Sequence, residues 1–213
     1  MKGFNFLLLL LLFSCEKKEN PVLEKDTRDY EVNRTAPTKP VDSLVLNDWF
    51  QYYHNENPDF SPEKFVLQQT SPISYTETSV IILNQKGFNE IYKPFLIFNE
   101  SKDHYLDLDS YQWFLGPDGS ASFEADQQVV LVDYKNKKAE QIAFFGPSYW
   151  IENAYWKGDS VAVLLGNSYE KVPFKMEYNF KKGRVKNYKY PDTLKFEKPY
   201  SKFKLEKKGI KIN

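Results

Sequence analysis

Short apolar runs separated by turn residues fill the chain from about residue 73 onward, and this pattern limits the folds available to it. Runs of β-branched and aromatic residues bounded by Gly, Pro, Asn or Asp are typical of β-strands. Six such runs are Val80–Leu83, Pro94–Phe98, Val129–Val132, Ile142–Phe145, Val161–Leu165 and Phe174–Phe180. The pattern predicts a mainly β fold, an antiparallel meander of short strands that is sandwich-like or barrel-like.

A weak internal repeat leaves an alternative fold open. Residues 94–108, 129–144 and 174–190 each contain an apolar strand, a turn with Lys and a second strand, and residues 203–212 resemble a shorter copy. The first three segments begin 35 and 45 residues apart, close to the period of β-propeller blades. A small or partial β-propeller is therefore the alternative, although the unequal spacing favours the meander.

The region before these strands predicts a short helical segment. Apolar residues near helical spacing run from Asp42 to about His54, and Ser61-Pro62 is typical of a second, short helix start. We therefore expect residues 41–213 to form a single mainly β domain in which residues 42–67 are partly helical.

The first fifteen residues predict an export signal. Lys2 precedes the apolar run Phe4–Phe13, which as a helix would span about half of a bilayer core that is roughly 30 Å thick. Such a segment is typical of a secretory signal peptide rather than of a permanent anchor. It is followed by Leu12-Phe13-Ser14-Cys15, which resembles the lipobox of bacterial lipoprotein precursors, and Cys15 is the only cysteine in the chain.

This resemblance implies that residues 1–14 are a signal peptide and that Cys15 carries lipid chains such as palmitate. Residues 15–40 would then be a lipidated flexible tether, because the segment is rich in charge and proline and offers almost nothing to bury. Glu16 stands where the inner-membrane retention signal of such lipoproteins is Asp, which implies the outer membrane. The expected location is the cell envelope, on either its periplasmic or its surface face, with the membrane as a partner through the lipid anchor.

Charge is divided unequally along the neutral chain. Residues 41–170 hold 8 Lys and Arg against 19 Asp and Glu, whereas residues 171–213 hold 14 against 4. The basic region can be interpreted as a surface for anionic lipid or polysaccharide. Lysines that alternate with apolar residues on solvated strand faces, as in Phe203-Lys204-Leu205, are the simpler interpretation. No nucleic-acid-binding motif occurs, so nucleic acid is not an expected partner.

The acidic residues around position 107 are the catalytic candidates. No nucleophile elbow, phosphate loop, HExxH or CxxC motif occurs in the sequence, so no cofactor and no metal is expected. On a strand, Asp107 and Asp109 would project from one face. With Asp118 or Asp126 they could bind Ca²⁺ or act as acid and base in glycoside hydrolysis. An outward, solvated face of an amphipathic strand is the simpler interpretation.

Aromatic clusters predict a binding surface. The candidate binding residues are Trp113, Tyr149, Trp150, Tyr155 and Trp156. Because Tyr155 and Trp156 are adjacent, a regular strand directs them to opposite faces, so one of them is either partly exposed or covered by another layer. Exposed rings beside acidic and amide groups suit stacking on sugars or anchoring a protein partner.

The sequence therefore favours a non-enzymatic envelope lipoprotein, a binding or accessory module that presents a β surface to a protein or a glycan. One alternative is an envelope glycan hydrolase or a Ca²⁺-dependent protein that uses the acidic strand near Asp107. A second alternative is a structural lipoprotein whose basic C-terminal region lies on the membrane.

Overall fold

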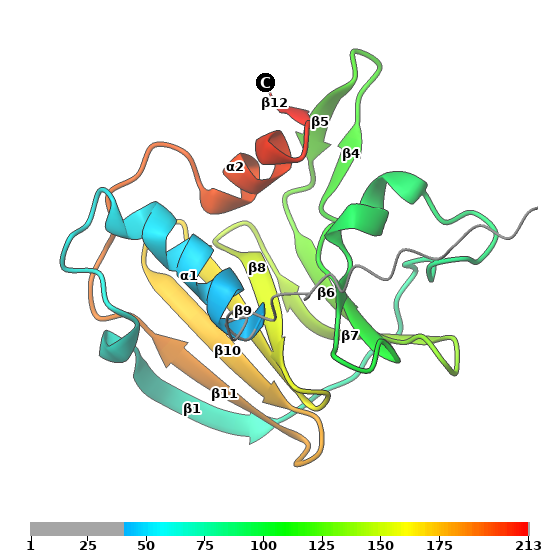
Figure 1. Ribbon diagram of the computed structural model, residues 1–213, viewed down its shortest axis with the longest axis horizontal. Coiled ribbons are helices and arrows are strands. Elements are labelled where there is room, and N and C mark those ends of the chain that lie inside the picture. The colour runs from blue at the N-terminus through cyan, green and yellow to red at the C-terminus, as the bar shows by residue number, and fades with distance from the viewer. Residues whose placement is uncertain (1–40, 213) are drawn as a thin grey trace, which may run out of the picture. The chain divides into compact units, whose positions relative to one another are not determined.

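A five-stranded antiparallel sheet forms the centre of the fold (Figure 1). The computed structural model describes residues 41–212, so the expected signal peptide, Cys15 and the tether lie outside the described residues. The strands are β1 (Val66–Pro72), β8 (Tyr149–Lys157), β9 (Val161–Ser168), β10 (Pro173–Asn179) and β11 (Arg184–Lys189). Their order is β1-β11-β10-β9-β8, so the four strands β8 to β11 form three successive hairpins.

Two smaller sheets complete the β structure. The four-stranded sheet has the order β2-β3-β6-β7, and the three-stranded sheet has the order β12-β5-β4. Their strands are β2 (Ile97–Phe98), β3 (His104–Asp107), β4 (Trp113–Leu115), β5 (Ser120–Phe123), β6 (Gln127–Asp133), β7 (Lys138–Phe145) and β12 (Lys211–Ile212). All pairs are antiparallel except that of β12 with β5. This confirms the mainly β, antiparallel prediction, and the unequal sheets differ from the repeated four-stranded blades of a propeller.

The two larger sheets pack face to face, and helix α1 (Val41–His54) covers the other face of the five-stranded sheet. Leu106 and Val129 of the four-stranded sheet meet Leu164 in the core between the sheets. Tyr155 is 6% exposed and packs under α1, whereas Trp156 is 5% exposed and packs between the sheets. A layer on each side of β8 therefore covers both rings, which is one of the two outcomes that the sequence left open.

The remaining helices are short. They are the 3₁₀ helices η1 (Pro62–Lys64) and η2 (Glu90–Phe95) and the α-helix α2 (Tyr200–Lys207). The helix expected from Asp42 to His54 and the short helix start at Ser61-Pro62 correspond to α1 and η1. In residues 41–212, none of the helices has the length and apolar character needed to cross a membrane.

The predicted hairpin at residues 203–212 is wrong, because the first half of this segment lies in α2. Lysines alternate with Phe203 and Leu205, which imitates the period of two of a strand. Gly209 ends the helix with a φ of 84°, and its N–H and that of Ile210 donate to the carbonyl groups of Glu206 and Leu205. This pair of hydrogen bonds is a Schellman motif, in which glycine tolerates the left-handed conformation. The Gly that the hairpin prediction placed in a turn therefore caps a helix.

Two of the six predicted strands also differ from the structure. Val80–Leu83 forms no strand; Ile82 and Leu83 pack against Tyr105 and Val132 on the outer face of the four-stranded sheet. Pro94 and its neighbour end η2, and only Ile97–Phe98 enters the ladder. Both runs are apolar because they pack into buried clusters. Burial alone does not require that a segment pair in a sheet.

Candidate binding pocket

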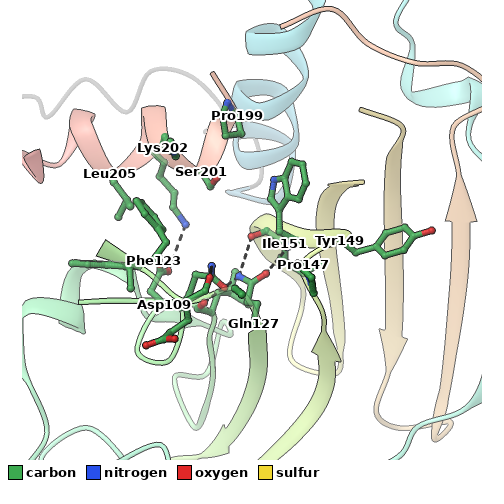
Figure 2. Close-up of a pocket in the computed structure, with 17 residues that line it drawn as sticks. Asp109, Phe123, Gln127, Pro147, Tyr149, Ile151, Pro199, Ser201, Lys202 and Leu205 are labelled. Atoms are coloured by element: carbon green, nitrogen blue, oxygen red, sulfur yellow. Dashed lines mark hydrogen bonds and ion pairs between the residues drawn. The ribbon is translucent and has the colours of Figure 1, made fainter. Parts of the chain in front are cut away.

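A pocket of about 260 Å³ lies where the ends of the three sheets meet α2 (Figure 2). Four parts of the chain line it: the link between β3 and β4, the link between β5 and β6, the start of β8, and α2. Its walls contain Asp109, Trp113, Tyr149 and Trp150, which the sequence singled out. The pocket therefore combines one acidic candidate with three of the five aromatic candidates.

One side of the pocket carries a partly buried ion pair. The Asp109 side chain is 8% exposed, and its Oδ2 lies 3.5 Å from Nζ of Lys204 on α2. Its Oδ1 accepts a hydrogen bond of 2.9 Å from the indole Nε1 of Trp113. Among the described residues, no hydrogen bond reaches Asp109 Oδ2. The wall of the pocket therefore carries a carboxylate that can accept hydrogen bonds beside an ammonium group that can donate them.

Aromatic residues also line the pocket. Tyr149 is 50% exposed, and Trp150 is partly exposed. Phe123 is exposed at the rim, and the Lys202 ammonium lies over its ring at 5.4 Å from the centroid. Trp113 is 1% exposed, so it belongs to the pocket wall rather than to the free surface. Phe123, Tyr149 and Trp150 are therefore the rings that a ligand can reach.

A buried carboxylate behind Trp150 holds that ring in position. Glu152 is fully buried, and its Oε1 accepts a hydrogen bond of 3.2 Å from Trp150 Nε1. Its carboxylate also accepts hydrogen bonds from Trp49 Nε1 at 2.7 Å and from Tyr53 Oη at 2.6 Å. Asn167 Nδ2 is a further donor at 3.0 Å. Burial and the neighbouring Glu152 raise the pKa of Tyr53, which therefore remains a donor.

The base of the pocket is held by Gln127 at the start of β6. Its Oε1 accepts a hydrogen bond of 2.6 Å from the backbone N–H of Ile151, and its Nε2 donates to the carbonyl groups of Leu108 and Ile151. This buried amide joins the ends of the two packed sheets directly beneath the pocket. Satisfied buried amides fix the geometry of their neighbours, so the pocket floor is pre-formed.

The predicted outward acidic face is wrong, because Asp107 and Asp109 are 3% and 6% exposed. Asp107 accepts hydrogen bonds from the backbone N–H groups of Asp109 and Ser110 at 3.1 and 2.9 Å, and from Ser110 Oγ. It therefore stabilises the turn that follows β3. Burial raises the pKa of the Asp107 carboxyl group.

The other two acidic candidates lie outside the pocket. Asp118 accepts hydrogen bonds from Ser120 N at 3.0 Å and from Ser120 Oγ at 2.6 Å, across the turn between β4 and β5. Asp126 directly precedes β6 and does not line the pocket. Within residues 41–212, no three His, Cys, Asp or Glu side chains are placed to hold a metal ion. Of the four candidates, Asp109 alone lines this pocket.

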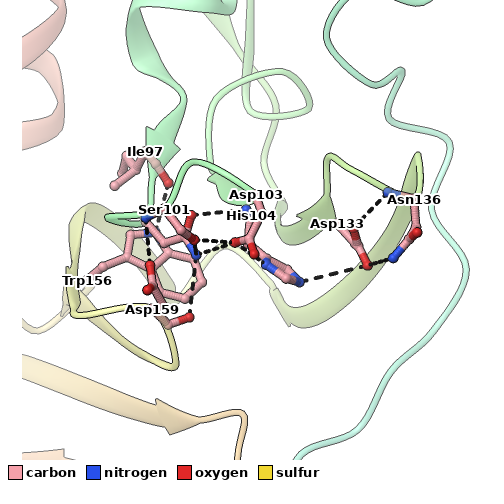
Figure 3. A network of polar contacts seen from close by, with 9 residues as sticks. Ile97, Ser101, Asp103, His104, Asp133, Asn136, Trp156 and Asp159 are labelled. Atoms are coloured by element: carbon pink, nitrogen blue, oxygen red, sulfur yellow. Dashed lines mark hydrogen bonds and ion pairs between the residues drawn. The ribbon is translucent and has the colours of Figure 1, made fainter.

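A second polar cluster surrounds His104, at the opposite end of β3 (Figure 3). Its Nδ1 lies 2.8 Å from Asp103 Oδ1, and its Nε2 lies 3.9 Å from Asp133 Oδ2. Asp103 also accepts hydrogen bonds from Asn99 and Ser101, and the Asn99 hydrogen bond is the main cause that lowers its pKa. These contacts close the turn between β2 and β3, which accounts for the acidic groups without a ligand.

The pocket contains residues that sequence reasoning missed. Lys204 was expected on a strand, and Lys202, Gln127 and Glu152 were given no role. Gly209 could have indicated that these lysines lie on a helix, because a glycine after a Lys-rich segment is typical of a helix end. Glu152 carried no comparable signal, since its importance depends on donors from three separate parts of the chain.

The comparisons with known proteins place the chain in no family. No family model matches the sequence. Neither the curated proteins nor the solved structures gave a match. The site is therefore interpreted from its own geometry.

Proposed function

We propose that this chain is a lipid-anchored protein of the bacterial cell envelope whose folded domain binds a glycan in the pocket beside α2. The observation that carries the glycan assignment is that the exposed Tyr149 and the partly exposed Trp150 line the same pocket as the Asp109–Lys204 ion pair. Sugars present apolar faces to rings and hydroxyl or amide groups to polar side chains, so this combination suits them.

The lining also favours a sugar that bears an acetamido group. Such a group has one N–H donor, one carbonyl acceptor and one methyl group. The Asp109 carboxylate can accept from the N–H, and the Lys204 ammonium can donate to the carbonyl. Leu108, Ile151 and Leu205 line the pocket and offer an apolar contact for the methyl group.

The two alternative functions have less support. A hydrolase with paired carboxylates needs two acidic groups that flank the bond to be cleaved. Glu124 is the other acidic residue in the lining, but the Asp109 carboxylate is already engaged by Trp113 and Lys204. A membrane-bound basic region needs free basic side chains. Four lysines of residues 171–213 contact the domain instead: Lys171, Lys198, Lys204 and Lys208 contact Phe196, Glu206, Asp109 and Pro94.

The lipid anchor is tested by feeding cells labelled palmitate. The wild-type chain should incorporate the label and fractionate with the outer membrane, because two or more acyl chains anchor a protein stably. Cys15→Ser should abolish both labelling and membrane retention. Unchanged labelling of Cys15→Ser, or an unlabelled wild-type protein, would contradict the anchor but would leave the pocket assignment standing.

Glycan binding is tested by titration calorimetry of the full-length chain in detergent with two tetrasaccharides, one of N-acetylglucosamine and one of glucose. The N-acetylated sugar should bind at least about tenfold more tightly, and Tyr149→Ala should weaken its binding by about tenfold, since a ring contact contributes on the order of 1 kcal/mol.

The matched control is Tyr169→Ala, because Tyr169 is 77% exposed and lies outside the pocket lining. Equal binding by both variants, or no binding of either sugar, would contradict the assignment. Release of shorter sugars by the wild-type protein but not by Asp109→Asn would support the hydrolase instead.

A further inference from the structure

A wider groove adjoins the pocket on the five-stranded sheet. Its volume is about 680 Å³, and it is lined by residues of β1, β7, β8, β9, β10 and β11. Tyr149 lines both the groove and the pocket. Figure 2 shows its ring directed away from the other labelled side chains of the pocket. Tyr149 therefore stands at the boundary between the two depressions and is accessible to a ligand that occupies both.

Strand register places the groove residues in rows across the sheet. Gln69 of β1 pairs with Asn187 of β11, which pairs with Met176 of β10. Directly opposed residues of antiparallel strands project from the same face. These side chains therefore form one continuous surface that crosses the strands, rather than isolated pockets between them.

An aromatic surface forms the centre of the groove. The Phe174 ring lies 5.8 Å from the ring of Tyr149 and 5.8 Å from that of Phe145. It can lie this close to the sheet because its partner on β9 is Gly166. A Cβ atom on Gly166 would come within 2.6 Å of the Phe174 ring, so any side chain there would displace the ring. Gly166 therefore allows the Phe174 ring to lie against the sheet, which leaves the groove open above it.

Uncharged amides surround these rings. Gln68, Gln69 and Asn187 line the groove, whereas Glu170 and Lys189 contribute one charge of each sign. Among the described residues, the buried Oδ1 of Asn187 has no hydrogen-bond partner. A buried acceptor without a donor costs free energy, which a ligand hydroxyl group can recover. Amides beside rings, with no net charge, match a neutral polyhydroxylated chain better than an anion or a purely apolar lipid.

We propose that the groove is a second sugar subsite, so that the ligand is a linear oligosaccharide that runs from the pocket past Tyr149 and across the sheet toward β1. This inference rests on the proposed glycan-binding function. Four spacings separate β8 from β1, and at about 4.8 Å per spacing the surface extends roughly 19 Å. That distance is longer than a single sugar ring and requires several linked units to fill it.

The test is a length series of N-acetylglucosamine oligosaccharides, from one to six units, titrated into the full-length chain. Wild-type affinity should rise at least about tenfold between the disaccharide and the pentasaccharide and then level off. Phe174→Ala should remove most of this rise, because each ring contact contributes several-fold in affinity. Its affinity for the mono- and disaccharide should stay close to that of the wild type, since Phe174 does not line the pocket.

A second variant tests the groove even if Phe174→Ala does not fold. Gln69 is exposed on the outer strand, so Gln69→Ala should fold and should still reduce the gain in affinity with length. Tyr169→Ala serves as the control and should behave as the wild type. Affinity that is independent of length, or a rise that Phe174→Ala and Gln69→Ala leave intact, would overturn the groove while the pocket assignment stands. Absence of binding at every length would overturn the proposed function itself.

Discussion

Replacing Glu152 with Ala should lower the free energy of unfolding by about 4 kcal/mol, because each buried donor left without an acceptor costs roughly 1–3 kcal/mol. The carboxylate is fully buried and accepts from Trp49, Tyr53, Trp150 and Asn167. Such a loss is a large part of the 5–15 kcal/mol that typically stabilises a domain. Urea unfolding followed by circular dichroism measures it.

Glu152→Gln is the variant that distinguishes the hydrogen bonds from the volume of the side chain. Gln fills the same space but has only one acceptor oxygen. Its NH₂ group is itself a donor, so it cannot accept the hydrogen bonds that the second carboxylate oxygen accepted. We expect a loss of about 2–3 kcal/mol. The matched control is Glu177→Gln, since Glu177 forms an exposed ion pair with Lys157 at 3.0 Å, worth less than about 1 kcal/mol. Equal losses in the two Gln variants would contradict the role assigned to Glu152.

The Glu152 variants should also alter the pocket. Trp150 Nε1 donates to Glu152, so Glu152→Gln removes or reorients the group that orients the ring. Ligand affinity should then fall even where the protein remains folded. Tryptophan fluorescence of the folded variant should change as well, because Trp49 and Trp150 both contact the carboxylate.

Alkaline unfolding between about pH 10 and 12 is the second large effect expected. Burial raises the pKa of Tyr105 and of Tyr200 to about 12. It also raises the pKa of Tyr53 and of Tyr178. The unfolded tyrosines lose their protons near pH 10. The folded state therefore binds more protons above pH 10, and stability that is fully present below that pH is lost as the pH rises.

The magnitude follows from a pKa of about 12 for each of these two tyrosines in the folded state, against about 10 in the unfolded state. Tyr105 and Tyr200 together therefore contribute about 5 kcal/mol of stability that is lost by pH 12. Both hydroxyl-bearing side chains are buried, at 0% and 7% exposure. We expect the far-ultraviolet circular dichroism signal and most of the tyrosinate absorbance at high pH to change together, in one cooperative step.

Tyr105→Phe provides the control for the pH effect. The Tyr105 hydroxyl accepts a hydrogen bond of 2.9 Å from the backbone N–H of Leu83, so its loss should cost about 1 kcal/mol at pH 8. Above pH 10, however, the stability of this variant should fall less steeply than that of the wild type. A gradual rise in tyrosinate absorbance with unchanged circular dichroism would show that the buried hydroxyl groups ionise in the folded state and would contradict the prediction.

Local patterns predicted the strands whose apolar residues also pair in a ladder. Val129–Val132, Ile142–Phe145 and Val161–Leu165 lie in β6, β7 and β9, and residues 129–144 form a hairpin as expected. Val80–Leu83 has the same composition but covers a sheet face without pairing. An apolar composition indicates that a segment is buried. Whether the buried segment forms a strand depends on whether the edge of a sheet beside it is free to pair.

The candidate site was predicted in part. Three aromatic residues of the pocket, Trp113, Tyr149 and Trp150, were named from the sequence, but Phe123 was not. The other two aromatic candidates, Tyr155 and Trp156, belong to two separate cores. The acidic residues were recognised as a group, yet their roles separate into turn caps at Asp107 and Asp118 and one ion pair at Asp109. Spacing along a strand cannot distinguish these roles, because each depends on a partner that the local sequence does not contain.

Local sequence patterns were enough to predict the mainly β class, the helical start and an anchored envelope protein, because strand periodicity, helix signals and the Cys15 motif are local. The contacts of Lys204 with Asp109 and of Trp49 and Tyr53 with Glu152, and the place of Tyr149 between a pocket and a groove, arise only when distant segments pack together. These contacts join residues about a hundred positions apart, and their free energy depends on burial that arises only when the sheets and helices pack together.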